Sequence, residues 1–202
     1  MTVLAAHTWP DNASLIADVW SLYGFDDAIV LDPTWGRGLW WKKVTPKNLI
    51  RHDKYKLDGV DFTQRLPEAP ESIDIVAFDP PYVSVGGRKT TGLPEMHDRY
   101  GLTDAAKSPY LLQCDINIGI SNCYRVLKPG GLLWVKCQDY ISSGKFWPGT
   151  YNTQLFCLER HCSFEQIDRF EMVGSPRSQP PNRRQVHARR NLSTLLIFRK
   201  VK

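Results

Sequence analysis

The chain has 202 residues, of which 42% are hydrophobic and 23% charged, proportions that suit one soluble domain spanning residues 1–202. No stretch approaches the roughly 20 apolar residues needed to cross a bilayer, which argues against a membrane partner, and residues 1–12 lack the regions of a secretory signal. The five cysteines are odd in number and form no CxxC pair. They predict buried thiols in a cytoplasmic protein rather than disulfides or a metal site.

The charge is unevenly distributed along the chain. The net charge is +5, yet no acid follows Glu171, and the eight basic residues after it leave −3 on residues 1–171. A concentrated basic end on a slightly acidic body favours contact with a polyanion. The alternative is a solvated loop with no ligand.

The first half of the chain alternates one helix with short apolar strands. Residues 11–25 open with an Asp/Asn cap and carry apolar side chains at helical spacing. A short amphipathic piece is expected at 39–43. The buried-strand patterns cover residues 28–32, 48–53 and 71–79.

The second half contains the clearest helix. Ser108 is its expected N-cap, Pro109 lies in its first turn, and the sequence KPGG after Leu127 should stop it. Its expected inner face consists of Leu111, Cys114, Ile118, Cys123 and Leu127. A strand at 132–137, a weaker helix at 150–162 and two final strands at 164–174 and 193–201 follow.

This alternation predicts an α/β fold with a mostly parallel sheet covered by helices on both faces. The last two strands have no helix between them, so they should pair antiparallel at one edge. The proline- and arginine-rich segment 175–192 joins them.

Four acids lie at or near the ends of predicted strands, where open α/β sheets bind ligands. They are Asp32, Asp53, Asp61 and Asp79. Each alone could be a turn former, but together with Gly36 and Gly38 they indicate a nucleotide-like pocket. A dinucleotide dehydrogenase is disfavoured, because Trp41 replaces the third glycine of its fingerprint and an acid before the turn would repel a pyrophosphate.

The sequences LDPTWGRG (residues 31–38) and FDPPY (residues 78–82) together resemble the S-adenosylmethionine-dependent amino-methyltransferases that act on exocyclic amines of nucleobases, of the DPPY type. The similarity runs from about residue 7 to residue 200. It implies a Rossmann-like class I methyltransferase fold, with a seven-stranded sheet that has one antiparallel edge strand. Thr34 departs from the usual phenylalanine of the first motif, and no large target-recognition region follows the core.

The resemblance also implies the roles of individual residues. The expected contacts to S-adenosyl-L-methionine are Asp32, Pro33, Thr34, Trp35, Gly36, Gly38, Asp53, Asp61 and Phe62. Within that set, Asp53 should meet the ribose and Asp61 the adenine amino group. The expected catalytic residues are Asp79, Pro80, Pro81 and Tyr82.

The catalytic motif has a physical rationale. An aromatic amine is a poor nucleophile because its lone pair is delocalised into the ring. Hydrogen bonds from its two N–H groups to Asp79 and to the Pro80 carbonyl would aim that lone pair at a methyl donor, and proline stiffness would fix the geometry. Tyr82 could then stack on a flipped base.

Two segments are expected to contact the substrate. Residues 83–107 are too long for a simple connection and are interpreted as a lid over the target base. The arginines of the basic loop should grip phosphates without reading sequence. The expected nucleic-acid contacts are Arg88, Lys89, Arg177, Arg183, Arg184, Arg189 and Arg190.

The function predicted from sequence is therefore methylation of adenine N6 in DNA. Methylation of cytosine N4 or of guanine N2 in rRNA stays open as an alternative, so RNA is a second candidate substrate. A non-catalytic nucleic-acid-binding subunit of the same fold is a third reading. Sequence-specific recognition would need a homodimer or a specificity partner.

Overall fold

The computed structural model describes residues 9–84, 108–159, 162–174, 184–188 and 190–201. Its centre is a mixed sheet of six strands in the order β2-β1-β3-β4-β8-β7. The strands are β1 (Ile29–Asp32), β2 (Asn48–Arg51), β3 (Ile73–Phe78), β4 (Leu127–Cys137), β7 (Phe164–Val173) and β8 (Leu192–Lys200). Strands β2, β1, β3 and β4 pair parallel to one another.

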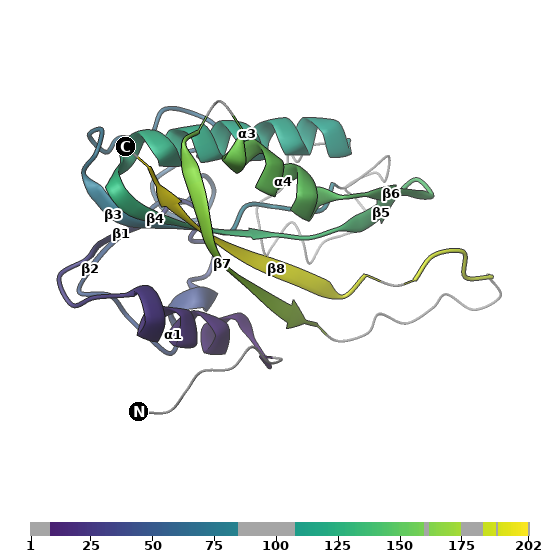
Figure 1. Cartoon of the computed structure of the whole chain (residues 1–202), viewed down its shortest axis with the longest axis horizontal. Helices are drawn as coiled ribbons and strands as arrows, with labels where there is room; N and C mark the ends of the chain where they lie inside the picture. The colour runs from purple at the N-terminus through teal and green to yellow at the C-terminus, as the bar shows by residue number, and fades with distance from the viewer. Residues whose placement is uncertain (1–8, 85–107, 160–161, 175–183, 189, 202) are drawn as a thin grey trace.

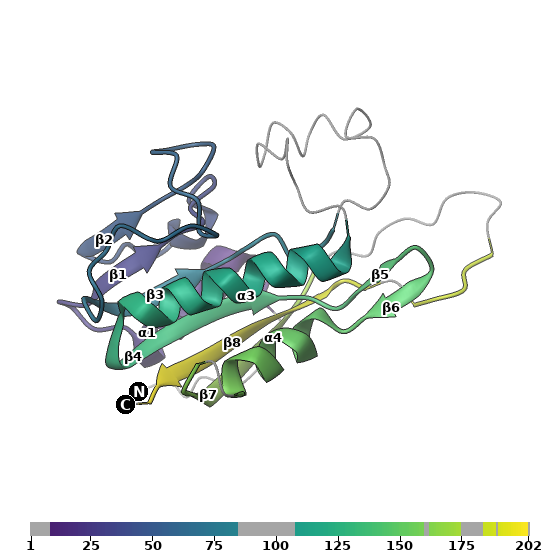
Figure 2. The same ribbon diagram turned by 90° about the horizontal axis from the view of Figure 1, so that it is seen from above.

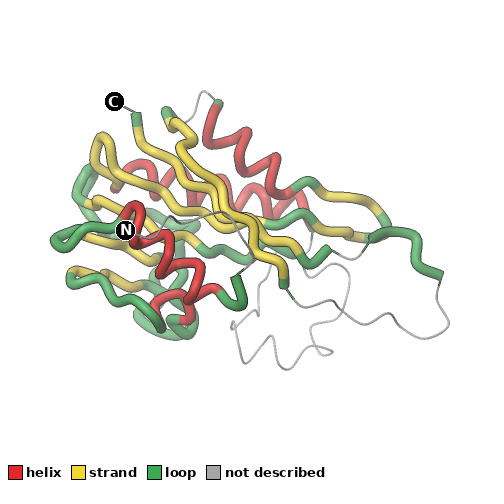
Figure 3. The backbone as a smooth tube through the Cα atoms, turned by 60° about the horizontal axis from the view of Figure 1, so that its bottom comes forward, coloured by secondary structure: helices red, strands yellow, loops and turns green. Residues whose placement is uncertain are grey.

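Helices cover both faces of this sheet, as predicted (Figures 1 and 3). Helices α3 (Pro109–Val126) and α4 (Gly149–Leu158) lie over one face, and α1 (Asn12–Tyr23) with the short helix η1 (Leu39–Trp41) covers the other. Alternate residues of β3 enter the two cores: Val76 and Phe78 pack under α3, while Ile75 and Ala77 pack under α1. The sheet is therefore buried on both sides.

The predicted strand count and edge were wrong. The described residues contain six strands in the main sheet, not the seven that the resemblance implied, and residues 59–66 form turns and loop. Side chains of α3 bind their backbone carbonyls: Asn122 donates to Phe62 and Gln64, and Arg125 donates to Leu66. The antiparallel strand β8 lies between β4 and β7, so β7 is the edge strand. The predicted antiparallel pairing of β7 with β8 is confirmed.

The caps of the helices confirm the sequence prediction. The Asp11 carboxylate accepts from Ser14 N at 2.7 Å, and Ser108 Oγ accepts from Leu111 N at 3.2 Å. Helix α3 ends at Val126, and the KPGG sequence that was expected to stop it lies inside β4.

The predicted inner face of α3 was mostly wrong. Its buried residues are Leu112, Ile116, Gly119, Ile120, Cys123 and Val126. Leu111 and Ile118 are 52% and 45% exposed. Gly119 explains why this face of the helix is the buried one, because a Cβ at this position would lie 2.5 Å from Cζ of Phe78 and only glycine allows so close an approach. The helix therefore turns its glycine to the sheet and leaves a second apolar stripe outside.

A two-stranded hairpin was missed by the sequence analysis. Strands β5 (Tyr140–Ser142) and β6 (Lys145–Trp147) pair antiparallel between β4 and α4. Figure 2 shows the hairpin extending beyond the end of the main sheet. No helix among the described residues is long and apolar enough to span a membrane.

Candidate functional site

The two predicted motifs meet at the carboxyl ends of β1 and β3. Asp32 is the last residue of β1, and Asp79 follows the last residue of β3. Thr34 links them, because its hydroxyl accepts from Asp79 N at 2.8 Å and lies 3.4 Å from Asp32 Oδ1. The departure from the family pattern at Thr34 thus supplies a polar bridge between the two loops.

Asp32 is a buried acid, with 4% of its surface exposed. Its carboxylate accepts from Thr34 N at 2.9 Å and from the Trp41 indole Nε1 at 2.8 Å. Burial raises the pKa of Asp32 to about 7, although the bonds from Trp41 and Thr34 oppose the rise and the nearby Asp79 adds to it. A cationic ligand beside Asp32 would favour its ionised form.

Asp53 closes the glycine-bearing turn. Its Oδ2 accepts from Gly36 N at 2.7 Å, and its Oδ1 accepts from Tyr55 N and Lys56 N at 2.8 and 2.7 Å. Gly36 has a φ of +55°, the left-handed region that favours glycine. Asp53 therefore couples the ends of β1 and β2, in addition to the ribose contact predicted for it.

Gly38 is needed for a different reason. Its φ is +64°, and a Cβ there would lie 2.4 Å from Cζ2 of Trp35. The Trp35 ring in turn lies under the Arg51 guanidinium, 5.0 Å from the ring centroid. Trp35 thus packs within the turn and against β2.

Asp61 and Phe62 lie on the loop that follows β2. Asp61 accepts from Thr63 N at 2.9 Å and pairs with Lys54 Nζ at 3.0 Å. Burial alone would raise the pKa of Asp61, but the Thr63 and Lys54 contacts outweigh it and lower the pKa. The Phe62 ring meets Phe78 edge-to-face at 5.2 Å, which connects this loop to the end of β3.

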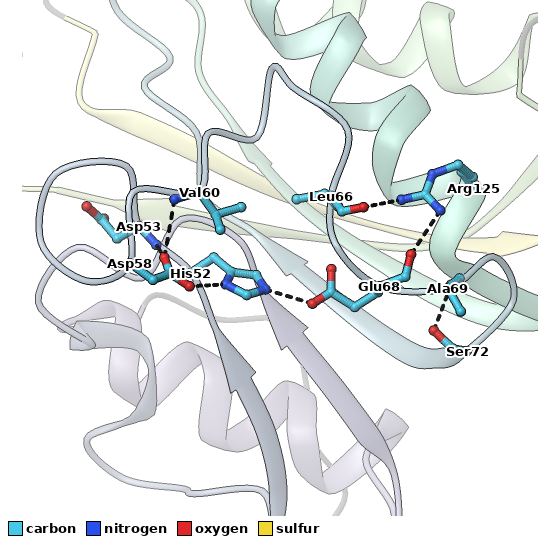
Figure 4. Close-up of polar contacts among 9 residues, drawn as sticks. All are labelled: His52, Asp53, Asp58, Val60, Leu66, Glu68, Ala69, Ser72 and Arg125. Atoms are coloured by element: carbon cyan, nitrogen blue, oxygen red, sulfur yellow. Dashed lines mark hydrogen bonds and ion pairs between the residues drawn. The ribbon is translucent and has the colours of Figure 1, made fainter.

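His52 holds the same loop together and was not predicted as part of the site. Its Nδ1 lies 2.5 Å from Asp58 Oδ2, and its Nε2 lies 2.7 Å from Glu68 Oε1 (Figure 4). Burial opposes the charged imidazole, but the bonds to Glu68 and Asp58 outweigh it and raise the pKa of His52. The histidine thereby joins Asp58 and Glu68, which lie on either side of Asp61 in the chain. The only sequence signal was its position at a strand end.

Lys136 is a second residue that the sequence analysis missed. Phe78 pairs with Val135 in the β3–β4 register, so the next residues, Asp79 and Lys136, are neighbours across the two strands. Lys136 is 1% exposed, and its ammonium donates to Asn12 Oδ1. Burial lowers the pKa of Lys136, while the charge of Asp79 opposes that change. The sequence signal that could have identified Lys136 was a lysine near the end of an otherwise apolar strand.

Asp79 keeps one acceptor atom without a partner. Its Oδ1 is buried and makes no hydrogen bond with any described residue. Burial raises the pKa of Asp79, opposed by the Lys136 ammonium and the indole N–H of Trp40. Trp40 is close enough to act electrostatically, but its Nε1 forms no hydrogen bond of ordinary geometry with the carboxyl. Asp79 Oδ1 is therefore a buried acceptor that a hydrogen-bond donor of a ligand at the end of β3 could satisfy.

A small pocket lies beside the residues that follow Asp79 in the chain. Tyr82 lines it together with Gln138, Tyr140 and Trp147, which come from the end of β4 and from the hairpin. The two hairpin aromatics were not predicted, because their place in this pocket depends on the missed β5–β6 pairing.

The predicted nucleic-acid contacts are only partly covered by the structure. Arg184 and Arg190 are exposed, and the Arg190 guanidinium lies 5.0 Å from the centroid of the Phe146 ring. Arg88, Lys89, Arg177, Arg183 and Arg189 lie outside the described residues, as does most of the predicted lid at 83–107. Four of the five cysteines are buried and all are free, as predicted. The described part of the chain contains no cluster of side chains that could hold a metal ion.

Neither family models nor curated protein sequences match this chain. Among solved structures, the MccD protein superposes with a TM-score of 0.53 at 15% identity, covering 96% of this chain and all of that protein. An rRNA methylase from Streptococcus thermophilus has a TM-score of 0.46 at 14% identity, covering 97% of this chain and 100% of that one.

A putative DNA modification methylase from Thermus thermophilus, complexed with S-adenosyl-L-methionine, has a TM-score of 0.47 at 17% identity. That match covers 70% of this chain and 54% of the methylase, so this chain spans about half of that protein's length. The MccD comparison shows a shared α/β fold.

Proposed function

We propose that the chain is an S-adenosylmethionine-dependent methyltransferase that methylates an exocyclic amine of a nucleobase, adenine N6 in DNA. The observation that carries this proposal is Asp79, whose buried Oδ1 has no partner among the described residues and lies beside Pro80 and Pro81. A buried carboxylate oxygen without a partner costs free energy, and a donor from a ligand would satisfy it. The Thr34 bridge ties this acid to the glycine-bearing turn.

The acids around the turn fit the proposed cofactor. Asp32 is buried with its pKa raised to about 7, and an ammonium or sulfonium nearby would stabilise its ionised form. Asp53 and Asp61 supply carboxylate acceptors on the neighbouring loop, where ribose hydroxyls and an adenine amino group would donate. When bound, the cofactor supplies an electrophilic methyl group on a positively charged sulfur.

The chain's own residues would prepare the amine. Asp79 and the Pro80 carbonyl would each accept one N–H, which draws the nitrogen lone pair out of conjugation and aims it at the methyl carbon. The amine held in this way would take the methyl group that the cofactor supplies, and the cofactor would leave as a neutral thioether. The methylated nitrogen would then release one proton, which the Asp79 carboxylate would accept. Tyr82 would stack on the base and offset part of the cost of flipping it.

The decisive experiment incubates the full chain with unmethylated DNA and methyl-labelled cofactor, and identifies the modified nucleoside by mass spectrometry. We expect N6-methyladenine. Asp79→Asn should lower the transfer rate by about 10²-fold or more while calorimetry still detects cofactor binding. Asp27→Asn is the matched control, because the Asp27 side chain is 82% exposed and remote from the turn.

Each outcome has a definite meaning. N4-methylcytosine, or methylated guanine from an rRNA substrate, would replace the proposed target base and keep the chemistry. Absence of cofactor binding at high concentration would favour a non-catalytic nucleic-acid-binding subunit. Wild-type transfer by Asp79→Asn would reject the role of Asp79.

A further inference from the structure

The β5–β6 hairpin has two different faces. Across the pair, Tyr140 lies opposite Trp147 and Ile141 lies opposite Phe146. Side chains alternate along a strand, so the first pair points to one face and the second pair to the other. Tyr140 and Trp147 line the pocket that Tyr82 also lines. One face of the hairpin is therefore a wall of the pocket that Tyr82 lines.

The opposite face carries an exposed aromatic ring backed by a cation. Phe146 is 47% exposed, and the Arg190 guanidinium lies 5.0 Å from its ring centroid. A phenylalanine held in this way keeps part of its ring surface open to solvent. An aromatic ring of this kind stacks on a nucleobase with little dependence on which base it meets.

The segment before β8 is fastened to the hairpin. His187 Nε2 lies 2.9 Å from the Gly144 carbonyl at the hairpin tip, and Gln138 Nε2 donates to the Arg190 carbonyl at 3.3 Å. Figure 2 shows this segment passing beside the end of the hairpin. The two pieces, residues 140–147 and the described residues 184–188 and 190, thus form one surface, which we call the hairpin surface.

The charge of the hairpin surface is of one sign. Lys145, Arg184 and Arg190 are exposed, and neither sequence contains an aspartate or a glutamate. Exposed cations without acids attract phosphates, and counterion release makes such binding depend on salt. An acid-free strip with an exposed ring is the composition of a single-strand binding surface.

We propose that the hairpin surface binds the DNA strand next to the target base, with Phe146 stacking on a neighbouring base and Lys145, Arg184 and Arg190 contacting phosphates. This inference rests on the proposed function, since it places the strand beside the pocket lined by Tyr82. These stacking and phosphate contacts would add affinity for the strand without reading its sequence.

Binding of the full chain to a fluorescein-labelled single-stranded DNA oligonucleotide, followed by anisotropy without cofactor, tests the proposal. Loss of one base stack by Phe146→Ala should raise Kd by roughly 5- to 150-fold, whereas Phe146→Trp should keep the affinity. Phe25→Ala is the matched control, because Phe25 is 53% exposed and follows α1, away from the hairpin. Because the Phe146 side chain is about half-exposed, its truncation should leave the fold intact, and the midpoint of thermal unfolding checks this.

The charge component is tested by salt titration. Lys145→Gln should make the slope of log K against log salt shallower by about 0.7. Lys47→Gln is its control, since Lys47 is 74% exposed and pairs with Asp27 far from the hairpin. If Phe146→Ala and Lys145→Gln bind DNA like their two controls, the proposal is wrong.

The binding assay separates this inference from the proposed function. Hairpin-dependent DNA binding without methyl transfer would reject the enzyme and keep the surface. Methyl transfer by the wild-type chain, together with normal DNA binding by the hairpin variants, would keep the proposed enzyme and reject the hairpin surface. Hairpin-dependent binding to an RNA oligonucleotide of the same sequence, with none to DNA, would overturn the assignment of DNA as the ligand.

Discussion

Replacing Thr34 by valine should separate the two motif loops. In the structure the Thr34 hydroxyl accepts from Asp79 N at 2.8 Å and contacts Asp32 Oδ1 at 3.4 Å. Valine keeps the β-branched shape but removes the acceptor, so the Asp79 N–H at the end of the buried strand loses its partner. Asp32 keeps its bonds from the Thr34 backbone N–H and from Trp41.

The magnitude follows from the bond that is lost. A buried N–H without a partner costs about 1–3 kcal/mol, while the long contact to Asp32 contributes little. We therefore expect Thr34→Val to lower the free energy of unfolding by about 1–3 kcal/mol, and Thr34→Ser to change it by less than about 0.5 kcal/mol. A displacement of Asp79 by about 1 Å would also slow methyl transfer by about 10²-fold.

Urea unfolding followed by circular dichroism measures the first quantity, and single-turnover transfer of labelled methyl measures the second. The serine variant is the matched control because it keeps a hydroxyl at the same position. If the valine variant unfolds at the same urea concentration as wild type, the hydroxyl does not hold the Asp79 N–H. If it loses stability but transfers methyl at the wild-type rate, Thr34 supports the fold without positioning Asp79.

Three further predictions concern residues that support the site. Lys136→Met removes the ammonium that lowers the pKa of Asp79, so the acidic limb of the pH–rate profile should move to higher pH. Lys136→Arg keeps a positive charge and should return the limb to its wild-type position. An unmoved limb in the methionine variant would contradict the role assigned to Lys136. Gly119→Ala places a Cβ 2.5 Å from Phe78 Cζ and should cost about 1–3 kcal/mol in urea unfolding, so an unchanged midpoint would show that the ring can give way. The pKa of His52 is raised, so its stabilisation is fully present below its unfolded pKa of about 6.5 and is lost as pH rises through the folded pKa. The stability difference between wild type and His52→Gln should therefore shrink above neutral pH, and a difference that grows would reverse the assignment.

Local patterns in the sequence predicted the parts of the fold that depend on local chemistry. The caps at Asp11 and Ser108 were found because a side-chain oxygen satisfies nearby backbone N–H groups whatever the rest of the chain does. Strand β3 was found because a run of apolar residues must be buried. The acids Asp32 and Asp79 were placed at one sheet edge because parallel strands end together.

The inner face of α3 and the hairpin could not be predicted in this way. Helix α3 carries apolar residues on both its buried and its exposed side, and the close approach of Gly119 to the rings of Phe62 and Phe78 goes with the face that the structure buries. Strands β5 and β6 are three residues each, too short to give a periodic signal. They are defined by their pairing, by the pocket that they line together with Tyr82, and by the contact of Phe146 with Arg190.

The sequence by itself determined the alternation of elements, the stiff ends of β1 and β3 and the acids that follow them, because each depends on residues adjacent in the chain. Only the tertiary structure decided which groups meet those acids. Lys136 lies beside Asp79 through the register of β3 and β4, and His52 is held between Asp58 and Glu68 through the path of a loop. Such contacts join residues that are distant in sequence, and their geometry is set by packing of the whole sheet rather than by any local pattern.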